Sequence, residues 1–290
     1  MGRPNVGKSS LLNVLIGHKI AIVSNKPQTT RTKITGILTE GDTQLVFIDT
    51  PGLHKPKTAL GQYMVRKISD SVSGVDGAIL MVEAHEPGAE ELDLINRFKT
   101  LKIPAVLVIN KIDTLKHKSE LAEVISRYSV LFAFKTVVPA SVKNGEGVDI
   151  ILNAIKEFCV AGPHFFDDDD VTDQPEKVIV SEIIREKILR LTDKEIPHGI
   201  AVAIEKMSER TGQSGAVTDI EAIIYCEKES HKGILIGKNG EMLKKIGSRA
   251  RQDLEVFFDI KINLQLWIKV KEDWRNRQGL LYSLGFDDRE

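Results

Sequence analysis

The chain has 290 residues, of which 42% are hydrophobic and 28% charged, so its length allows two hydrophobic cores and its composition excludes disordered and fibrous classes. Forty basic residues against 41 acidic ones give a net charge of −1, so any basic face must come from local clustering. Only Cys159 and Cys226 are present, no apolar run approaches the ~20 residues that span a bilayer, and no signal-peptide pattern is seen. We expect a cytosolic protein, with peripheral membrane contact left open.

Residues 2–160 alternate short apolar runs with helical patterns. Continuous aliphatic runs at 45–49, 77–82 and 104–109 predict strands buried on both faces, and amphipathic patterns predict helices at 59–72, 88–100, 119–127 and 146–158. Two strand-like runs meeting at Glu40-Gly41-Asp42 predict a hairpin with one antiparallel strand at the sheet edge. The pattern predicts a doubly wound, mostly parallel α/β domain over residues 1–161.

The character changes between residues 162 and 176, where Gly-Pro, four aspartates at 167–170 and Pro175 favour a solvated linker over a metal site. Residues 177–290 then read as an α+β domain. Its predicted elements are a helix at 177–191, strands at 199–206 and 218–227, a Gly-rich turn, a helix at 241–255, a strand at 260–266 and a helix at 270–284.

The first motif is Gly2-Arg-Pro-Asn-Val-Gly7-Lys8-Ser9, which matches the phosphate-binding pattern G-x-x-x-x-G-K-[ST] at every fixed position. Its glycines allow backbone N–H groups to cradle phosphate oxygens at the start of a helix. We expect Lys8 to reach the β- and γ-phosphates and Ser9 to bind Mg²⁺. Asp49-Thr-Pro-Gly52 follows a predicted buried strand, so Asp49 is expected to order Mg²⁺ through water and Gly52 to approach the γ-phosphate.

A base-reading motif, Asn110-Lys-Ile-Asp113, follows another predicted strand. A carboxylate at Asp113 accepts two adjacent hydrogen bonds, which guanine offers through N1–H and its amino group and adenine does not, so the motif favours GTP over ATP. Asn110 is expected to tie neighbouring loops together, and the stem of Lys111 to cover the base. The nucleotide site predicted from these motifs comprises Gly2, Asn5, Val6, Gly7, Lys8, Ser9, Ser10, Asp49, Gly52, Asn110, Lys111 and Asp113.

With these motifs in order, the chain resembles the translation-factor-related small GTPases, and specifically the bacterial Era family, from Gly2 to about Gly285. Its further markers are Lys26-Pro-Gln-Thr-Thr-Arg31, Asp49-Thr-Pro-Gly-Leu-His54, Gly233-Ile-Leu-Ile-Gly-Lys-Asn-Gly240 and Leu266-Trp-Ile-Lys-Val-Lys-Glu-Asp-Trp-Arg275. The resemblance implies that Thr30 contacts Mg²⁺ and the γ-phosphate, giving the metal set Ser9, Thr30 and Asp49. It also places the guanine-binding loop at Ser141-Val142, with valine in place of the usual alanine.

Leu53 stands where Ras-like GTPases place a catalytic glutamine, so a slow intrinsic rate is expected. In related enzymes with a hydrophobic residue there, a phosphate-loop asparagine helps bind K⁺, and Asn5 occupies that position. K⁺ is therefore a further cofactor by hypothesis, and the catalytic set implied by the resemblance is Lys8, Thr30, Gly52 and Asn5.

Gly237-Lys-Asn-Gly240 is a G-x-x-G loop, which in KH domains clamps about four nucleotides. Residues 231–277 contain 11 Lys/Arg and 6 Asp/Glu. This basic surplus favours a surface that binds nucleic acid over a helix face that is merely solvated. The predicted element order resembles a type II KH domain that binds single-stranded RNA, through Ile236, Gly237, Lys238, Asn239, Gly240, Lys244, Lys245 and Arg249. Trp267 and Trp274 are expected in packing rather than base stacking.

By resemblance the RNA is the 3′ end of small-subunit ribosomal RNA, and the protein a monomeric ribosome-assembly factor. Relatives carry an aliphatic strand before the phosphate loop where this sequence has only Met1, so weak nucleotide binding is a concern. An RNA-binding protein whose G domain scarcely hydrolyses nucleotide is the alternative. A P-loop ATPase or kinase is a third hypothesis, against which the Asn110–Asp113 motif argues.

Overall fold

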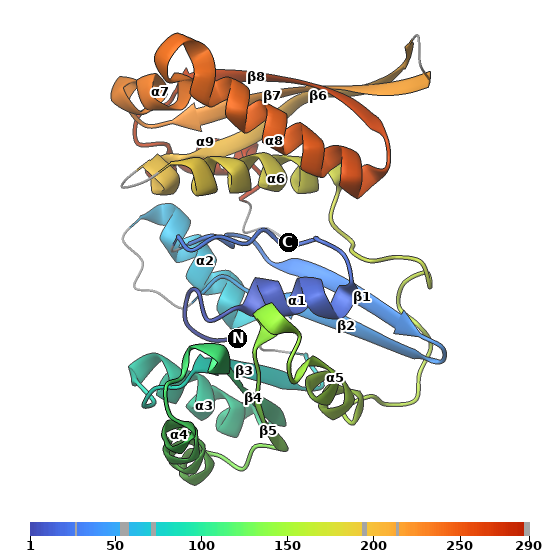
Figure 1. Ribbon diagram of the computed structural model, residues 1–290, viewed down its shortest axis with the longest axis vertical. Helices are drawn as coiled ribbons and strands as arrows, with labels where there is room; N and C mark the ends of the chain where they lie inside the picture. Colours follow the sequence, from blue (N-terminus) through green and yellow to red (C-terminus); the bar gives the residue numbers. More distant parts are fainter. Residues whose placement is uncertain (27, 53–57, 71–73, 193–195, 213–214, 287–290) are drawn as a thin grey trace. The chain divides into compact units, whose positions relative to one another are not determined.

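The computed structural model describes residues 1–26, 28–52, 58–70, 74–192, 196–212 and 215–286. The chain divides into two compact units (Figure 1). The first unit consists of Met1–Ala21, Thr30–Lys55 and Met64–Asp173, and the second of Ile22–Thr29, Pro56–Tyr63 and Gln174–Glu290. Two short segments of the N-terminal half therefore pack with the C-terminal half. Within the described residues, no helix has the length and apolar character needed to cross a membrane.

The first unit contains a parallel sheet with helices on both faces, which confirms the predicted P-loop class of α/β fold. Strands β3 (Ala78–Glu83), β4 (Ala105–Asn110) and β5 (Thr136–Pro139) pair in that order. Helices α1 (Lys8–Ile16) and α5 (Val148–Lys156) share one apolar core, and α3 (Ala89–Leu101) and α4 (Lys118–Leu131) share another. Every residue of β4 is buried, because helices cover both of its faces. Strand β5 is the one strand of this sheet that the sequence reasoning did not anticipate.

The predicted hairpin is present, as β1 (Ile34–Glu40) and β2 (Thr43–Asp49) in antiparallel register, but it is not the edge of the parallel sheet. It forms a two-stranded sheet of its own. A cavity of about 810 Å³ lies where β2 faces β3, lined by apolar side chains that include Leu11, Leu15, Leu45, Phe47, Ile79 and Phe158. Met1 alone pairs with β3 there: its ammonium donates to the Ile79 carbonyl (2.6 Å) and its carbonyl accepts from Met81 N–H (2.9 Å).

The predicted linker is tied to the hairpin over part of its length. Ile37 N–H donates to the Val171 carbonyl at 2.9 Å, and Thr172 Oγ1 donates to the Thr35 carbonyl at 2.6 Å. Gln44 Oε1 also accepts hydrogen bonds from two successive backbone N–H groups, those of Phe165 and Phe166. Residues up to Asp173 therefore belong to the first unit. The long helix α2 (Ala59–Asp70) begins in the second unit and continues into the first.

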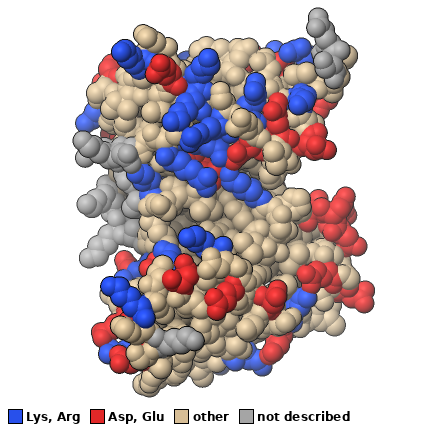
Figure 2. All heavy atoms as spheres, viewed as in Figure 1, with Lys and Arg blue, Asp and Glu red and all other residues tan. Residues whose placement is uncertain are grey.

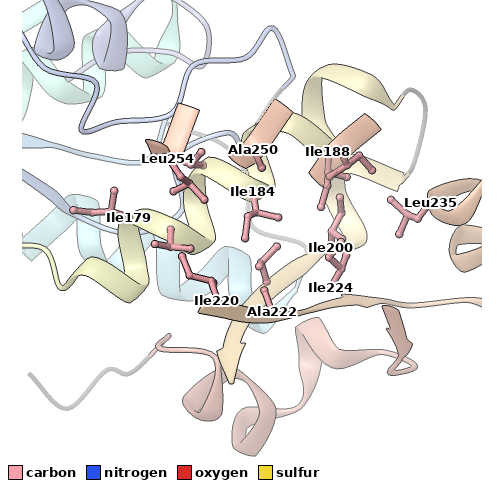
Figure 3. Packing of buried hydrophobic residues seen from close by; sticks show 14 of the residues in the cluster. Ile179, Ile184, Ile188, Ile200, Ile220, Ala222, Ile224, Leu235, Ala250 and Leu254 are labelled. Carbon is pink, nitrogen blue, oxygen red and sulfur yellow. The ribbon is translucent and has the colours of Figure 1, made fainter. Parts of the chain in front are cut away.

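The second unit is a three-stranded sheet packed against helices, and its order α-β-β-α-α-β matches the predicted KH class. After α6 (Glu176–Leu191), strands β6 (Ala201–Gly212) and β7 (Gly215–Cys226) pair antiparallel, and β8 (Lys261–Val270) pairs parallel to β7. Helices α7 (Glu229–Ile236) and α8 (Glu241–Phe258) flank the G-x-x-G loop. Figure 3 shows the core, where Ile184 and Ile188 of α6 meet Ala250 and Leu254 of α8 over the sheet.

Three expectations about the second unit were wrong. The segment before the G-x-x-G loop is the helix α7 and not only a turn. The last predicted helix, 270–284, is shorter, because β8 extends to Val270 and a 3₁₀ turn (Trp274–Asn276) precedes α9 (Gln278–Ser283). Trp274 is fully buried and donates through Nε1 to the Gly199 carbonyl at 3.0 Å, as a packing role requires. Trp267 on β8 is instead 43% exposed, because its side chain points away from the core that Ile262 enters.

Candidate functional site

The phosphate-binding motif forms a tight loop between Met1 and α1. Gly2 (φ 143°) and Gly7 (φ 108°) have left-handed backbones, and so does Asn5 (φ 64°). A Cβ atom at Gly2 would lie 2.2 Å from the Met81 carbonyl oxygen, and one at Gly7 would lie 2.4 Å from Asn110 Nδ2. Neither position therefore accepts a side chain. The N-cap of α1 is Gly7, which has no side chain to bond the first N–H groups of the helix, so these groups are available to an anion held by the loop.

Lys8 lies at the centre of this loop. Its Nζ donates to the carbonyls of Gly2 (3.2 Å) and Arg3 (2.9 Å), so the loop curls around the ammonium. Burial lowers the pKa of Lys8, and the nearby Asp49 carboxylate partly offsets this effect. A partly buried cation whose partners are mainly neutral carbonyls is stabilised by an incoming anion. The geometry therefore suits a phosphate oxygen beside Lys8.

Three oxygen-bearing side chains converge next to the loop. Ser9 Oγ donates to Asp49 Oδ2 at 2.5 Å and lies 3.0 Å from Thr30 Oγ1, and Thr30 Oγ1 lies 3.5 Å from the same carboxylate oxygen. Asp49 and Thr30 are buried. Hydroxyl and carboxylate oxygens are the ligands that Mg²⁺ uses together with water and substrate phosphates. The residues present thus fit a Mg²⁺ ion held from the C-terminal end of β2.

The second phosphate motif approaches the loop at Gly52. A Cβ atom there would lie 2.9 Å from the backbone nitrogen and Cα of Pro4, so only glycine allows this approach. The residues that follow, Leu53 and His54, lie outside the described part of the chain. The prediction attached to Leu53, a slow intrinsic rate, stays a prediction.

The base-reading motif is joined to the phosphate loop by one side chain. Asn110, buried at the end of β4, donates through Nδ2 to the Val6 carbonyl at 2.8 Å and accepts from Val142 N–H at 3.0 Å through Oδ1. Asp113 Oδ1 accepts from Ser141 Oγ at 2.7 Å, which orients the carboxylate. All three loops of the predicted site therefore meet at the C-terminal ends of β2 and β4 (Figure 1).

Sequence reasoning missed two acidic residues that support these loops. Glu83 accepts from Lys111 Nζ at 2.5 Å, and its position opposite Asn110 in the β3–β4 register could have indicated it. Glu91, buried in the first turn of α3, accepts from Arg3 Nη2 at 2.7 Å and from Gly88 N–H at 2.9 Å. It fixes the second residue of the phosphate loop. Its capping contact with Gly88 at the start of α3 is local, but no local motif signals its contact with Arg3, because that contact depends on how α3 packs.

The G-x-x-G loop forms the second candidate site. Gly237 (φ 73°) connects α7 to the loop, and a Cβ atom there would lie 2.7 Å from Met242 Cβ. Asn239 and Gly240 are also left-handed, while Lys238 and Asn239 are exposed. This backbone leads directly into the N-terminus of α8. The loop therefore combines the Lys238 cation with a backbone that a sugar-phosphate chain can approach closely. A clamp on such a chain requires both features.

A hollow of about 390 Å³ adjoins this loop, between α8 and β8. Gly240 and Lys244 line it, together with Leu243, Gly247, Ser248, Arg251, Asn263, Leu264 and Leu266, which the sequence prediction did not include. Lys245 and Arg249 are exposed one helical turn apart on the neighbouring face of α8 and do not line the hollow. Figure 2 shows Lys and Arg side chains gathered in a band over the second unit. Basic side chains thus gather on the face of the second unit that this view shows.

The fold and these sites define the class: a P-loop GTPase domain followed by a KH domain. A profile described as "50S ribosome-binding GTPase" matches residues 1–111, and one described as "KH domain" matches residues 195–275. GTPase Era of Ruminiclostridium cellulolyticum is 50% identical over 287 residues, covering 99% of this chain and 95% of the relative. GTPase Era of Clostridioides difficile is 47% identical over 290 residues, covering 100% and 97%. The chain belongs to the Era GTPase family.

Two solved structures are similar to this chain over nearly its full length. A crystal structure of Era in complex with MgGDPNP and nucleotides 1506–1542 of 16S ribosomal RNA has a TM-score of 0.92 at 35% identity, covering 98% of this chain and 96% of that one. A variant of Aquifex aeolicus Era bound to GDP and aluminium fluoride gives the same TM-score, identity and coverage. The predicted cofactors, GTP or GDP and Mg²⁺, agree with these complexes.

Proposed function

We propose that this chain is a GTP-hydrolysing switch that binds single-stranded RNA at the 3′ end of small-subunit ribosomal RNA and acts in assembly and maturation of the small ribosomal subunit. The observation that carries the proposal is the bridge made by Asn110. One buried amide joins the phosphate loop at Val6 to the base-reading loop at Val142, so the triphosphate and the base are held in one rigid site. The Era complex with MgGDPNP and 16S ribosomal RNA supports the choice of both ligands.

In the nucleotide site, the backbone N–H groups from Asn5 to Ser10 hold the α- and β-phosphates, and Lys8 binds the β- and γ-phosphates. Asp113 accepts from guanine N1–H and the exocyclic amino group, in the orientation that Ser141 imposes. Lys111, held by Glu83, covers one face of the base. Backbone groups of Ser141 and Val142 contact the base edge. Specificity for guanine arises because adenine would leave the Asp113 carboxylate unpaired.

For hydrolysis, Ser9 and Thr30 would hold Mg²⁺ through their hydroxyl groups, and Asp49 would order it through water. A Mg²⁺ ion held there would supply positive charge to the β- and γ-phosphate oxygens. Gly52 donates its N–H to the γ-phosphate from its place beside Pro4. Asn5, whose left-handed backbone turns the loop, would help to hold K⁺. These residues position and stabilise charge, which is the chief contribution that proteins make to phosphoryl transfer.

For RNA, the backbone around Gly237 and Gly240 clamps the sugar-phosphate chain, and Ile236 and Lys238 to Asn239 border the entrance. Lys244, Lys245 and Arg249 neutralise phosphates along α8. Bases enter the hollow between α8 and β8, whose apolar floor is formed by Leu264 and Leu266. The proposed partner places the protein in the cytoplasm. A peripheral contact with the inner face of the membrane and a monomeric state stay predictions.

The proposal is tested by calorimetry with GTP and ATP, followed by titration of an RNA oligonucleotide with the sequence of the small-subunit 3′ end. We expect GTP to bind and ATP not to compete, and the RNA to bind more tightly with a non-hydrolysable GTP analogue than with GDP. Lys244→Ala should weaken RNA binding roughly tenfold and reduce the salt slope by about one. The control Lys99→Ala changes an exposed lysine of α3 and should leave RNA affinity unchanged. Equal affinity for GTP and ATP would refute the nucleotide assignment.

A further inference from the structure

The segment Ile22–Thr29, which leads into Thr30, packs with the second unit. Its backbone is held by helix α6. Val23 N–H donates to Glu186 Oε1 at 3.0 Å, and the Val23 carbonyl accepts from Arg190 Nε at 3.1 Å. The carbonyl of Thr29 accepts from the guanidinium of Arg185. The segment is therefore fixed near both of its ends by side chains of the KH-bearing unit.

The carboxyl group of Glu186 is fully buried. Lys187 Nζ lies 2.9 Å from its Oε2, and Arg190 Nη2 lies 3.0 Å from its Oε1. Buried carboxylates persist where cations and N–H donors surround them, and removing one member leaves the others unpaired. The Val23 N–H is one of these donors. Detaching the segment from α6 would therefore disturb the whole group of charges.

The same group reaches the helix that follows the G-x-x-G loop. Lys187, which is buried, also pairs with Asp253 of α8. Helix α8 begins at Glu241, directly after that loop. A continuous series of polar contacts thus runs from the Val23 backbone through Glu186 and Lys187 to α8.

The segment after the second phosphate motif is held by the second unit in a similar way. Ala59 N–H donates to Asn276 Oδ1 at 3.1 Å, and the ring of Tyr63 packs edge-on against Phe286 with centroids 5.7 Å apart. Pro56–Tyr63 is assigned to the second unit with Ile22–Thr29. Ala59 and Tyr63, which follow the Asp49–Gly52 motif in the sequence, are therefore also supported by C-terminal residues.

We propose that Arg185 and Glu186 are positioning residues for GTP hydrolysis, which act by fixing the backbone that carries Thr30 into the nucleotide site. This inference rests on the proposed role of Thr30 at Mg²⁺ and the γ-phosphate. Thr29, whose carbonyl Arg185 holds, is joined to Thr30 by a peptide bond, so its placement limits where the Thr30 hydroxyl can lie. GDP has no γ-phosphate and does not need this placement. The contacts of Arg185 and Glu186 with this segment therefore affect the rate of GTP hydrolysis and not the affinity for GDP.

The test compares Glu186→Ala, Glu186→Gln and Arg190→Ala in the full chain, measuring single-turnover GTP hydrolysis, GDP affinity and thermal unfolding. Loss of the Val23 hydrogen bond should slow hydrolysis roughly tenfold, with GDP affinity within about twofold of wild type. Glu186→Gln keeps an acceptor for Val23 N–H and should recover part of the rate. Arg190 is half exposed, so its replacement tests the same hold if Glu186→Ala fails to fold. Glu176→Gln, an exposed position on the same helix, is the matched control.

Thr30→Ala separates this inference from the function it rests on. If Thr30→Ala is slow while the Glu186 and Arg190 variants hydrolyse GTP at the wild-type rate, the positioning role is wrong and the role of Thr30 stands. If Thr30→Ala is itself as fast as wild type, the proposed site chemistry fails. A parallel loss of GDP affinity and rate in Arg190→Ala would also overturn the inference, because it would indicate a general structural defect.

Discussion

Replacing Asn110 with alanine removes two hydrogen bonds that join the phosphate loop to the guanine-binding loop. Nδ2 donates to the Val6 carbonyl at 2.8 Å, and Oδ1 accepts from Val142 N–H at 3.0 Å. Because the site is buried, the two backbone groups left behind gain no solvent partner. At about 1–1.5 kcal/mol for each bond, the loss amounts to about 2–3 kcal/mol. If this loss of free energy destabilises only the nucleotide-bound state, GDP affinity should drop roughly 30- to 150-fold.

The assay is a fluorescence titration with a labelled GDP at fixed Mg²⁺ and salt, paired with thermal unfolding in the presence and absence of GDP. Asn144→Ala provides the control, because Asn144 is an exposed asparagine in the neighbouring 3₁₀ turn (Val142–Asn144). A GDP affinity within twofold of wild type for Asn110→Ala would show that the two loops do not depend on this bridge. The account of the nucleotide site as one rigid unit would then be wrong.

Three further changes address the other parts of the proposal. Asp113→Asn replaces one acceptor with a donor, so the affinity for GTP should fall roughly 100-fold or more and the affinity for xanthosine triphosphate should rise. Competition titrations will show both changes. Gly237→Ala places a Cβ atom 2.7 Å from Met242 Cβ at φ 73°, so it should destabilise the loop by about 1–2 kcal/mol and weaken RNA binding with GTP affinity unchanged. Exchange of KCl for NaCl should slow GTP hydrolysis if Asn5 helps bind K⁺; equal rates would remove that hypothesis.

The motifs of the nucleotide site were predictable because they are short and lie where strands end or a helix begins. Gly2–Ser9 opens a helix, Asp49–Gly52 follows the second strand of the hairpin, and Asn110–Asp113 follows a strand of the parallel sheet. Required glycines gave a second local signal, since Gly2 and Gly7 have backbones that other residues avoid. The G-x-x-G loop was recognisable for the same reason.

Tertiary structure decided what depends on distant packing. Periodicity could not show that β1 and β2 form a sheet of their own, because the partner with which a strand pairs depends on tertiary packing and not on local pattern. The sequence gives no signal that distinguishes Trp267 from Trp274. In the structure Trp267 is exposed and Trp274 is buried, because only the side chain of Trp274 faces the core. Above all, the sequence by itself determined the chemistry of the nucleotide pocket. The tertiary structure alone placed Ile22–Thr29 on α6, because a backbone segment held by Glu186 and Arg185, more than 150 residues away, leaves no local pattern.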